Sequence, residues 1–286
     1  MAYTIGQLLE LTSGHFSELG LETPRLDAEV LLADLLNLDR VHLCTEYQKP
    51  LNTREVDRYR ERVIARSKGV PVAYITGMKE FMSLSLKINE DVLIPRPETE
   101  LLVEEALELL KERESRGAGL KVADVGTGSG AIALSLAHYL PCLEVYGIDI
   151  SAEALKIATE NMHRLGIKGV TLLEGSFLEP LIQKGMTVDM VIANPPYIPA
   201  GKMEELQEEV KHEPQIALVG GEDGLAAYRS IAAQLGMVLQ EDGLVLLEIG
   251  QDQADAVTGI LREEGFSDIE VIHDLAGLPR LVVARS

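Results

Sequence analysis

Apolar positions in the first quarter of the chain recur at helical spacing. From Ile5 to about Lys68 the periodicity shows no strand alternation, which predicts a small bundle of helices. Thr23-Pro24 marks the cap and first turn of one helix, and the charged stretch at 53–68 predicts another. This part of the chain contains no cluster of catalytic side chains. We therefore interpret residues 1–74 as a helical domain that recognises a substrate.

The spacing changes after residue 74. Phe81 to Ile88 alternates apolar and polar side chains at period two, and Val92 to Ile94 is expected to return as a short strand after a turn at residues 89–91. Residues 75–95 are therefore predicted to form a β-hairpin linker.

Beyond the linker, apolar runs alternate with amphipathic segments, which is typical of a parallel sheet with crossover helices. Strands are expected at residues 121–125, 143–149, 170–174, 188–193, 243–249, 268–273 and 281–284. Helices are expected from residue 98 to about 113 and at 131–138, 152–165, 225–240 and 251–264, with a polar loop at 114–119. The last two strands lack a long crossover and should be antiparallel. We predict an α/β fold whose second domain, 96–286, is a seven-stranded doubly wound Rossmann-like sheet.

Four residues, Asn194-Pro195-Pro196-Tyr197, follow the buried strand at 188–193. Two consecutive prolines stiffen the backbone, so the Asn194 side chain and the Pro195 carbonyl keep little freedom. Both groups are acceptors that can hold the two N–H hydrogens of a planar NH2 group, whose face the Tyr197 ring can cover. This constellation suits an enzyme that attacks with a poor nitrogen nucleophile, such as an amide or an exocyclic base amine.

A glycine-rich turn, Gly126-Thr127-Gly128-Ser129-Gly130, follows the first long strand and precedes an apolar helix. Alternate glycines let the backbone approach a ligand, and the helix adds a positive N-terminus. The spacing departs from the dinucleotide pattern G-x-G-x-x-G, and alone it is weak evidence for a cofactor. Asp149 strengthens the evidence for a cofactor site, because an acid at the end of the next strand can bind ribose hydroxyls. Phe177, after the third strand, can offer an aromatic wall to a purine.

Composition fits a soluble α/β protein. The chain has 286 residues, 46% of them hydrophobic, and no apolar run approaches the ~20 residues that span a membrane. The N-terminus lacks the features of a signal peptide, so we expect a cytoplasmic location and, as the simplest state, a monomer. Cys44 and Cys142 are interpreted as small buried hydrophobic residues rather than a disulfide. No His, Cys or Asp spacing indicates a metal site, so no metal is expected.

Charge is distributed unevenly along the chain. The net charge is −20, with 11 Lys/Arg against 13 Asp/Glu in residues 1–90 and 15 against 33 in residues 91–286. An acidic surface repels phosphate backbones, so no direct nucleic-acid contact is expected, whereas a basic protein partner would be favoured. The alternative is that the charge only keeps the protein soluble. Glu204-Glu205 and Glu208-Glu209 are interpreted as a solvated helix face.

With these motifs in view, the chain resembles class I S-adenosylmethionine-dependent methyltransferases and, more closely, the release-factor glutamine methyltransferase family (PrmC/HemK). The resemblance covers nearly the full length. It rests on Ile94-Pro-Arg-Pro-Glu-Thr-Glu100, Asp124-Val-Gly-Thr-Gly-Ser-Gly130, Asn194-Pro-Pro-Tyr-Ile198, and His212-Glu-Pro-Gln-Ile-Ala-Leu218 followed by Gly220-Gly-Glu-Asp-Gly224.

The resemblance implies a cofactor, S-adenosyl-L-methionine, which leaves as S-adenosyl-L-homocysteine. The cofactor would be bound by Gly126, Thr127, Gly128, Ser129, Gly130, Asp149, Phe177 and Asn194. Catalysis would fall to Asn194, Pro195 and Tyr197, and the substrate would contact these residues with Pro196, Arg96 and Glu98. The implied acceptor is the side-chain amide (N5) of the glutamine in the Gly-Gly-Gln motif of class I peptide chain release factors. Phe177 stands where many relatives have Trp, and Gly277-Leu-Pro-Arg280 is less polar than the family would suggest.

Two other functions remain open from the residues alone. An adenine-N6 or guanine-N2 methyltransferase acting on nucleic acid would use the Asn194 motif equally well on a flipped base. The negative charge and the lack of a basic, aromatic-rich segment disfavour it. A non-catalytic cofactor-binding partner protein is the second alternative, and the intact motifs at both Asn194 and the glycine turn disfavour that function.

Overall fold

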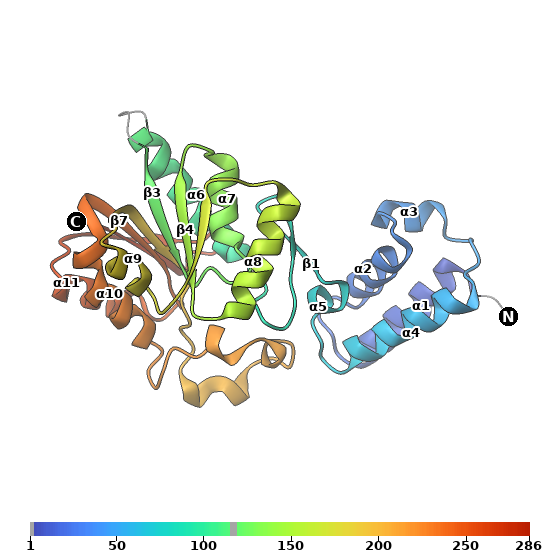
Figure 1. The fold of residues 1–286 in the computed structure, drawn as a ribbon. Coiled ribbons are helices and arrows are strands. Elements are labelled where there is room, and N and C mark those ends of the chain that lie inside the picture. Colours follow the sequence, from blue (N-terminus) through green and yellow to red (C-terminus); the bar gives the residue numbers. More distant parts are fainter. Residues whose placement is uncertain (1–2, 115–118) are drawn as a thin grey trace. The chain divides into compact units, whose positions relative to one another are not determined.

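The computed structural model describes residues 3–114 and 119–286, so most of the predicted polar loop at 114–119 lies outside the described residues. The chain divides into two compact units (Figure 1). The helical unit contains Met1–Met78 and Gln207–His212, and the sheet unit contains Lys79–Leu206 and Glu213–Ser286.

The helical unit has the predicted bundle. Its helices are α1 (Ile5–Glu18), α2 (Pro24–Leu36), α3 (Arg40–Thr45), α4 (Thr53–Ser67) and α5 (Val72–Thr76). Capping boxes start α1 and α4, because the N-cap side chains of Thr4 and Asn52 accept from the backbone three residues on while that residue's side chain reaches back. Pro24 opens α2 as predicted, but the Thr23 hydroxyl donates to Asp27 instead of capping the helix.

A buried arginine explains why residues 207–212 belong to the helical unit. Arg66 of α4 is 3% exposed, and its guanidinium donates to Asp27 Oδ2 at 2.7 Å and to Glu209 Oε1. His212 Nε2 lies 3.2 Å from the Lys68 carbonyl oxygen. The Glu209 side chain is 42% exposed, but it is not only solvated, because its carboxylate pairs with the buried guanidinium.

The linker forms a hairpin in a different register from the predicted one. Its strands are β1 (Met78–Phe81) and β2 (Leu84–Lys87). The turn between them places Met82 and Ser83 at φ 47° and 58°, as in a two-residue hairpin turn. Neither residue is the Gly or Asn that usually marks such a turn, so the alternation was interpreted as one uninterrupted strand. Residues 92–94 form no strand.

The sheet unit contains the predicted seven strands: β3 (Lys121–Val125), β4 (Glu144–Asp149), β5 (Val170–Glu174), β6 (Val188–Ala193), β7 (Leu239–Glu248), β8 (Asp268–His273) and β9 (Pro279–Arg285). Their order is β5-β4-β3-β6-β7-β9-β8. The first five strands in that order are parallel. The last pair, β8 and β9, is antiparallel as predicted, and β9 also runs antiparallel to β7. From β3 the chain adds β4 and β5 on one side and then returns to add β6 and β7 on the other. This switch between β3 and β6 leaves a crevice at the carboxyl ends of the strands.

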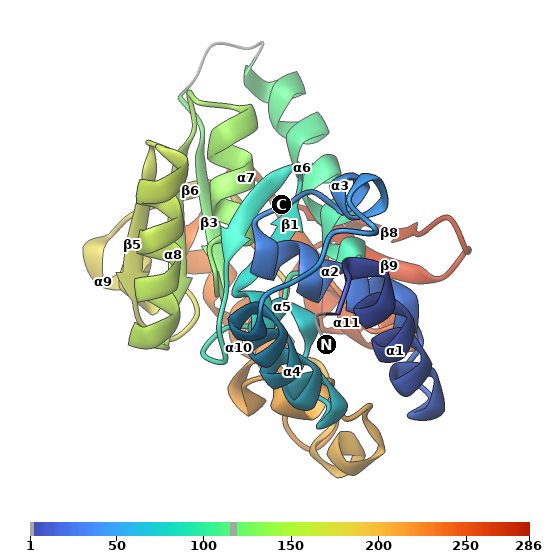
Figure 2. The ribbon, with the colours of Figure 1, turned by 90° about the vertical axis from the view of Figure 1, so that its right-hand side faces the viewer.

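Helices cover both faces of this sheet (Figures 1 and 2). One face carries α6 (Pro97–Glu114), α7 (Ala131–Tyr139) and α8 (Ala152–Leu165), and the other carries α9 (Glu179–Lys184), α10 (Ala226–Val238) and α11 (Ala254–Glu263). Successive β3 residues supply opposite cores, since Val122 packs with α6 and α7 whereas Ala123 packs with α10 and α11. Short 3-10 turns, Ala200–Glu205 and Gln215–Ala217, occupy the stretch between β6 and α10.

The described residues contain neither a membrane-spanning helix nor a metal-binding cluster, and both cysteines are exposed. Within residues 3–114 and 119–286, no helix is both long and apolar enough to cross a membrane. The same described residues contain no group of three or more His, Cys, Asp or Glu side chains that could hold a metal ion. Cys44 and Cys142 are both exposed, so the prediction that they are buried was wrong.

Candidate active site

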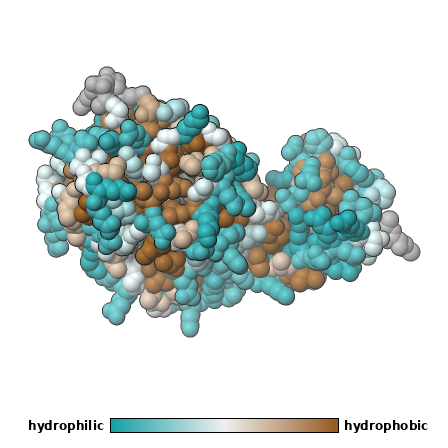
Figure 3. All heavy atoms as spheres, viewed as in Figure 1, coloured by the Kyte–Doolittle hydropathy of each residue, from teal (hydrophilic) through white to brown (hydrophobic). Residues whose placement is uncertain are grey.

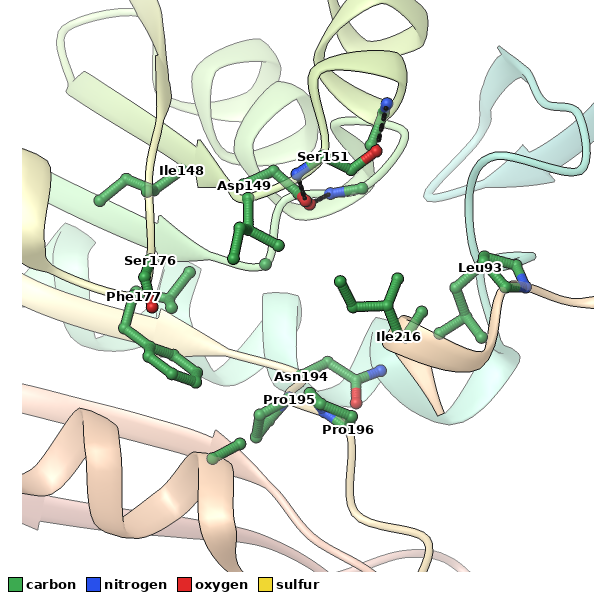
Figure 4. A pocket seen from close by; sticks show the side chains of 18 of the residues that line it. Leu93, Ile148, Asp149, Ser151, Ser176, Phe177, Asn194, Pro195, Pro196 and Ile216 are labelled. Atoms are coloured by element: carbon green, nitrogen blue, oxygen red, sulfur yellow. Dashed lines mark hydrogen bonds between the residues drawn. The ribbon is translucent and has the colours of Figure 1, made fainter. Parts of the chain in front are cut away.

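A cavity of about 380 Å³ lies at the carboxyl ends of the parallel strands (Figure 4). Figure 4 shows Ile148, Ser176 and Phe177 on one wall and Leu93 and Ile216 on the opposite wall. The lining is mainly apolar, and Figure 3 shows hydrophobic residues gathered on this part of the sheet unit. Such a cavity at the point where strand order reverses is typical of a ligand site.

The glycine turn forms one edge of the cavity and is held by β4. Gly126 and Thr127 donate their backbone N–H groups to the Ile148 carbonyl at 2.8 and 2.9 Å. The Asp149 carboxylate accepts from the Gly128 N–H at 2.8 Å and from the Ser151 N–H at 2.9 Å. Burial raises the pKa of Asp149, although these backbone hydrogen bonds lower it. Both predicted features, the turn and the acid, therefore meet at the cavity edge.

Only part of the glycine turn lines the cavity. Gly126 and Gly128 line it, but Thr127, Ser129 and Gly130 do not. The Thr127 hydroxyl donates to Asp124 Oδ2 at 2.6 Å, and Asp124 also accepts from the backbone of α7. Burial raises the pKa of Asp124 to about 7. Thr127 therefore fixes the turn through Asp124, and Ser129 is buried.

Phe177 lines the cavity at the position where the sequence predicted an aromatic wall. Its backbone is left-handed, with φ 49°. Leu178 N–H donates to the Gln234 side chain at 2.8 Å, which fixes the chain directly after it. The ring is one side of the cavity in Figure 4, and Asp149 lies on a neighbouring side.

Asn194 connects the cavity with a buried polar chain behind it. Asn194, Pro195 and Pro196 line the cavity. Asn194 Nδ2 donates to Thr99 Oγ1 at 3.1 Å, and Thr99 Oγ1 donates to Glu248 Oε2 at 2.7 Å. Thr99 and Glu248 are each 4% exposed. The asparagine is therefore held by the Thr99 hydroxyl, which lies in the motif at 94–100, and through it by the Glu248 carboxylate, which lies outside the sequence motifs.

Tyr197 does not line the cavity. Burial raises the pKa of Tyr197, and the nearby Glu248 raises it further, while Arg96 and Arg280 lower it. Its phenol is therefore protonated at neutral pH.

The backbone of the Asn194 motif is held in place by Leu218, Gly220 and the Gln253 side chain. Ile198 N–H donates to the Leu218 carbonyl at 2.9 Å, and the Gln253 side chain donates to the Tyr197 carbonyl at 3.0 Å. A Cβ at Gly220 would come within 2.5 Å of the Pro196 carbonyl oxygen, so only glycine fits there. This close approach gives the glycine block a role that the sequence alone did not reveal.

Arg96 forms an ion pair that sequence reasoning missed. It donates to Glu213 Oε1 at 2.5 Å, while Glu213 Oε2 accepts from the Ile94 N–H at 3.1 Å. Glu213 is 4% exposed. Neither Arg96 nor Glu98 lines the cavity, and Glu98 is exposed at the start of α6. Glu248 was missed as well, although it ends an apolar strand just as Asp149 does.

The order of the sheet, with the glycine turn and Asn194 at one edge, defines a methyltransferase of class I fold. Residues 116–247 match the family model described as a methyltransferase domain, and residues 7–77 match the PrmC N-terminal domain. The chain belongs to the release factor glutamine methyltransferase family, which confirms the resemblance.

Two curated relatives carry that assignment, and both are called release factor glutamine methyltransferase. The one from Moorella thermoacetica is 46% identical over 93% of this chain and 92% of its own length. The one from Geobacter sulfurreducens is 42% identical over 99% and 97%. Among solved structures, the hMettl16 catalytic domain in complex with the MAT2A 3′UTR hairpin 1 is similar with a TM-score of 0.56. It is 15% identical and covers 82% of this chain and 81% of that one, so it supports the fold alone.

Proposed function

We propose that the protein transfers the methyl group of S-adenosyl-L-methionine to the side-chain amide nitrogen of the glutamine in the Gly-Gly-Gln motif of class I release factors. One observation carries the proposal. Asn194 lines the cavity while its Nδ2 is engaged by Thr99, which leaves Oδ1 and the Pro195 carbonyl as acceptors for the two N–H hydrogens of an amide.

The cavity suits the proposed cofactor. A Cβ at Gly126 would meet no atom within 4 Å, so the glycine leaves open space for a ligand beside the turn. Asp149 is placed to accept from ribose hydroxyls, and Phe177 can cover one face of the adenine. When bound, the cofactor supplies an electrophilic methyl group on a sulfonium centre.

Positioning accounts for the proposed catalysis. An amide nitrogen shares its lone pair with the carbonyl and attacks poorly. Tyr197 is not placed to act as a base, since it does not line the cavity and its pKa is raised by burial. The acceptors at Asn194 and Pro195 would grip and aim the nitrogen, and such alignment can lower a barrier by roughly 7–11 kcal/mol.

The helical domain at residues 1–74 is proposed to recognise the release factor. Its match to the PrmC N-terminal domain and its distance in sequence from the cavity-lining motifs support this role. The hairpin at 75–95 would link it to the methyltransferase domain at 96–286. That the protein acts as a cytoplasmic monomer stays a prediction.

Methyl transfer from labelled S-adenosylmethionine tests the proposal. The acceptors are a purified class I release factor, its Gln-to-Ala variant in Gly-Gly-Gln, and bulk tRNA, rRNA and DNA. We expect label on the wild-type release factor and none on the variant or the nucleic acids. Label on nucleic acid would instead support an exocyclic base amine as the acceptor, and no transfer to any acceptor would favour a non-catalytic partner.

A further inference from the structure

Asn194, Thr99 and Glu248 form a hydrogen-bonded chain from three separate elements. Asn194 follows β6, Thr99 lies in the first turn of α6, and Glu248 ends β7. The two hydrogen bonds are 3.1 and 2.7 Å long, and the two inner members are almost fully buried. Water therefore does not compete for these groups, and their own chemistry decides which atom donates.

That chemistry gives the chain a direction. An ionised carboxylate only accepts, so Thr99 donates its single hydroxyl hydrogen to Glu248. The Thr99 oxygen is then available only as an acceptor, and the NH2 end of Asn194 must face it. Asn194 Oδ1 is turned away, and no residue within 3–114 or 119–286 donates a hydrogen bond to it.

We propose that Thr99 and Glu248 are positioning residues that set the orientation of the Asn194 amide, so that Oδ1 and not Nδ2 faces the methyl acceptor. This inference rests on the proposed role of Asn194 as the acceptor for a substrate N–H. If the Asn194 side-chain amide were rotated by half a turn, its NH2 group would face the NH2 group of the substrate. Two donors would then meet without an acceptor.

Protonation of Glu248 would reverse the chain. A protonated carboxyl group can donate to Thr99, which is then free to donate to Asn194 Oδ1. Burial raises the pKa of Glu248 to about 7, although the hydrogen bond from Thr99 lowers it. The titratable groups around it are Glu98 of α6, Arg96 before α6, Arg280 of β9, Tyr197 after β6 and Tyr228 of α10.

The direction of the pH effect depends on which protonation state of Glu248 gives the productive Asn194 orientation. The ionised carboxylate sets the productive orientation, so methyl transfer should be fastest well above pH 7 and should decrease as the pH falls through about 7. Glu248→Gln, which cannot ionise, should remove this limb of the pH profile.

Kinetics of three threonine variants test the positioning role. Thr99→Val removes the hydroxyl with little change of shape and should lower kcat by roughly 10–100-fold, with the KM for the acceptor nearly unchanged. Thr99→Ser keeps the hydroxyl and should restore most of kcat. Thr258→Val is the matched control, because the Thr258 hydroxyl is buried in α11 and has no hydrogen-bond partner among the described residues. Wild-type kcat in Thr99→Val, or equal losses in Thr99→Ser and Thr99→Val, would overturn the proposal.

An NMR titration tests the same chain without any methyl acceptor. The chain contains five asparagines, so protein labelled with ¹⁵N-asparagine gives few side-chain NH2 signals, and Asn194→Ala identifies the one of interest. We expect the Asn194 signal to shift with a midpoint near pH 7 in wild type and Thr99→Ser, and to stay fixed in Glu248→Gln. A wild-type signal that does not titrate between pH 6 and 8 contradicts the proposal. Since no acceptor is present, a wrong acceptor and a wrong orientation give different results.

Discussion

The two sides of Asn194 are built in different ways. On the cavity side, Asp149 is held by two backbone N–H groups, those of Gly128 and Ser151. On the buried side, the carboxylates of Glu213 and Glu248 reach side chains more than 100 positions away in sequence. The cavity side is thus made by the local geometry of strand ends, whereas the buried side depends on long-range pairs of charged and polar side chains. The two sides should fail differently when they are changed.

The largest effect is expected on stability, at the ion pair on the buried side. Arg96→Ala leaves the Glu213 carboxylate buried with only the Ile94 N–H as a partner, and the free energy of unfolding should fall by about 3–5 kcal/mol. Glu213→Gln leaves the half-buried Arg96 accessible to water and keeps a hydrogen-bonding side chain, so it should lose about 1–3 kcal/mol. Denaturant unfolding of both variants measures the difference, and equal losses would contradict the assignment.

On the cavity side, Asp149→Ala should weaken cofactor binding, and it also removes the acceptor of the Gly128 and Ser151 N–H groups. Losing a charged acceptor is worth about 1.5–3 kcal/mol, which corresponds to a rise of roughly 10–100-fold in the dissociation constant. Calorimetric titration with S-adenosylmethionine measures this dissociation constant. Asp268→Ala, which removes an exposed acid at the start of β8, is the control and should bind normally.

Two glycines of the same turn should separate stability from binding. Both have left-handed backbones, so alanine at either one costs about 1–3 kcal/mol of strain. A Cβ at Gly130 would also lie 2.9 Å from Leu134 Cδ1, whereas one at Gly126 would meet nothing within 4 Å. Thermal unfolding should therefore show the larger loss for Gly130→Ala, while cofactor titration should show the larger loss for Gly126→Ala. The reverse order would mean that the cavity edge is misassigned.

The smallest effect is expected at the aromatic wall. Phe177→Ala should raise the dissociation constant of the cofactor by roughly tenfold, since an aromatic contact contributes about 0.5–1.5 kcal/mol in addition to its buried area. Phe177→Trp offers a larger ring and should bind at least as tightly as wild type. An unchanged affinity in Phe177→Ala would remove this residue from the site.

The same contrast explains what could be predicted from the sequence. A parallel sheet brings the carboxyl ends of its strands together, so the glycine turn, Asp149, Phe177 and Asn194 could be assigned to one edge from their positions after apolar runs. The fold followed for the same reason, because strand and helix periods alternate clearly beyond residue 96.

The parts that could not be predicted depend on contacts distant in sequence or on turns without a signature. Glu213 lies in the motif at 212–218 and Glu248 ends an apolar strand, but the sequence does not show that they pair with Arg96 and Thr99, more than 100 positions away. The hairpin was placed in the wrong register because Met82 and Ser83 adopt positive φ without glycine or asparagine. The ion pair of Glu209 was not predicted because its partner, Arg66, lies far away in the chain.

The central claim is that Asn194 aligns the amide nitrogen for methyl transfer. Its most direct test is the single-turnover rate of Asn194→Ala with S-adenosylmethionine and a class I release factor both saturating. The account predicts a rate lower by about 100-fold or more, because a misaligned nucleophile loses most of the benefit of positioning. A rate close to that of wild type would contradict it.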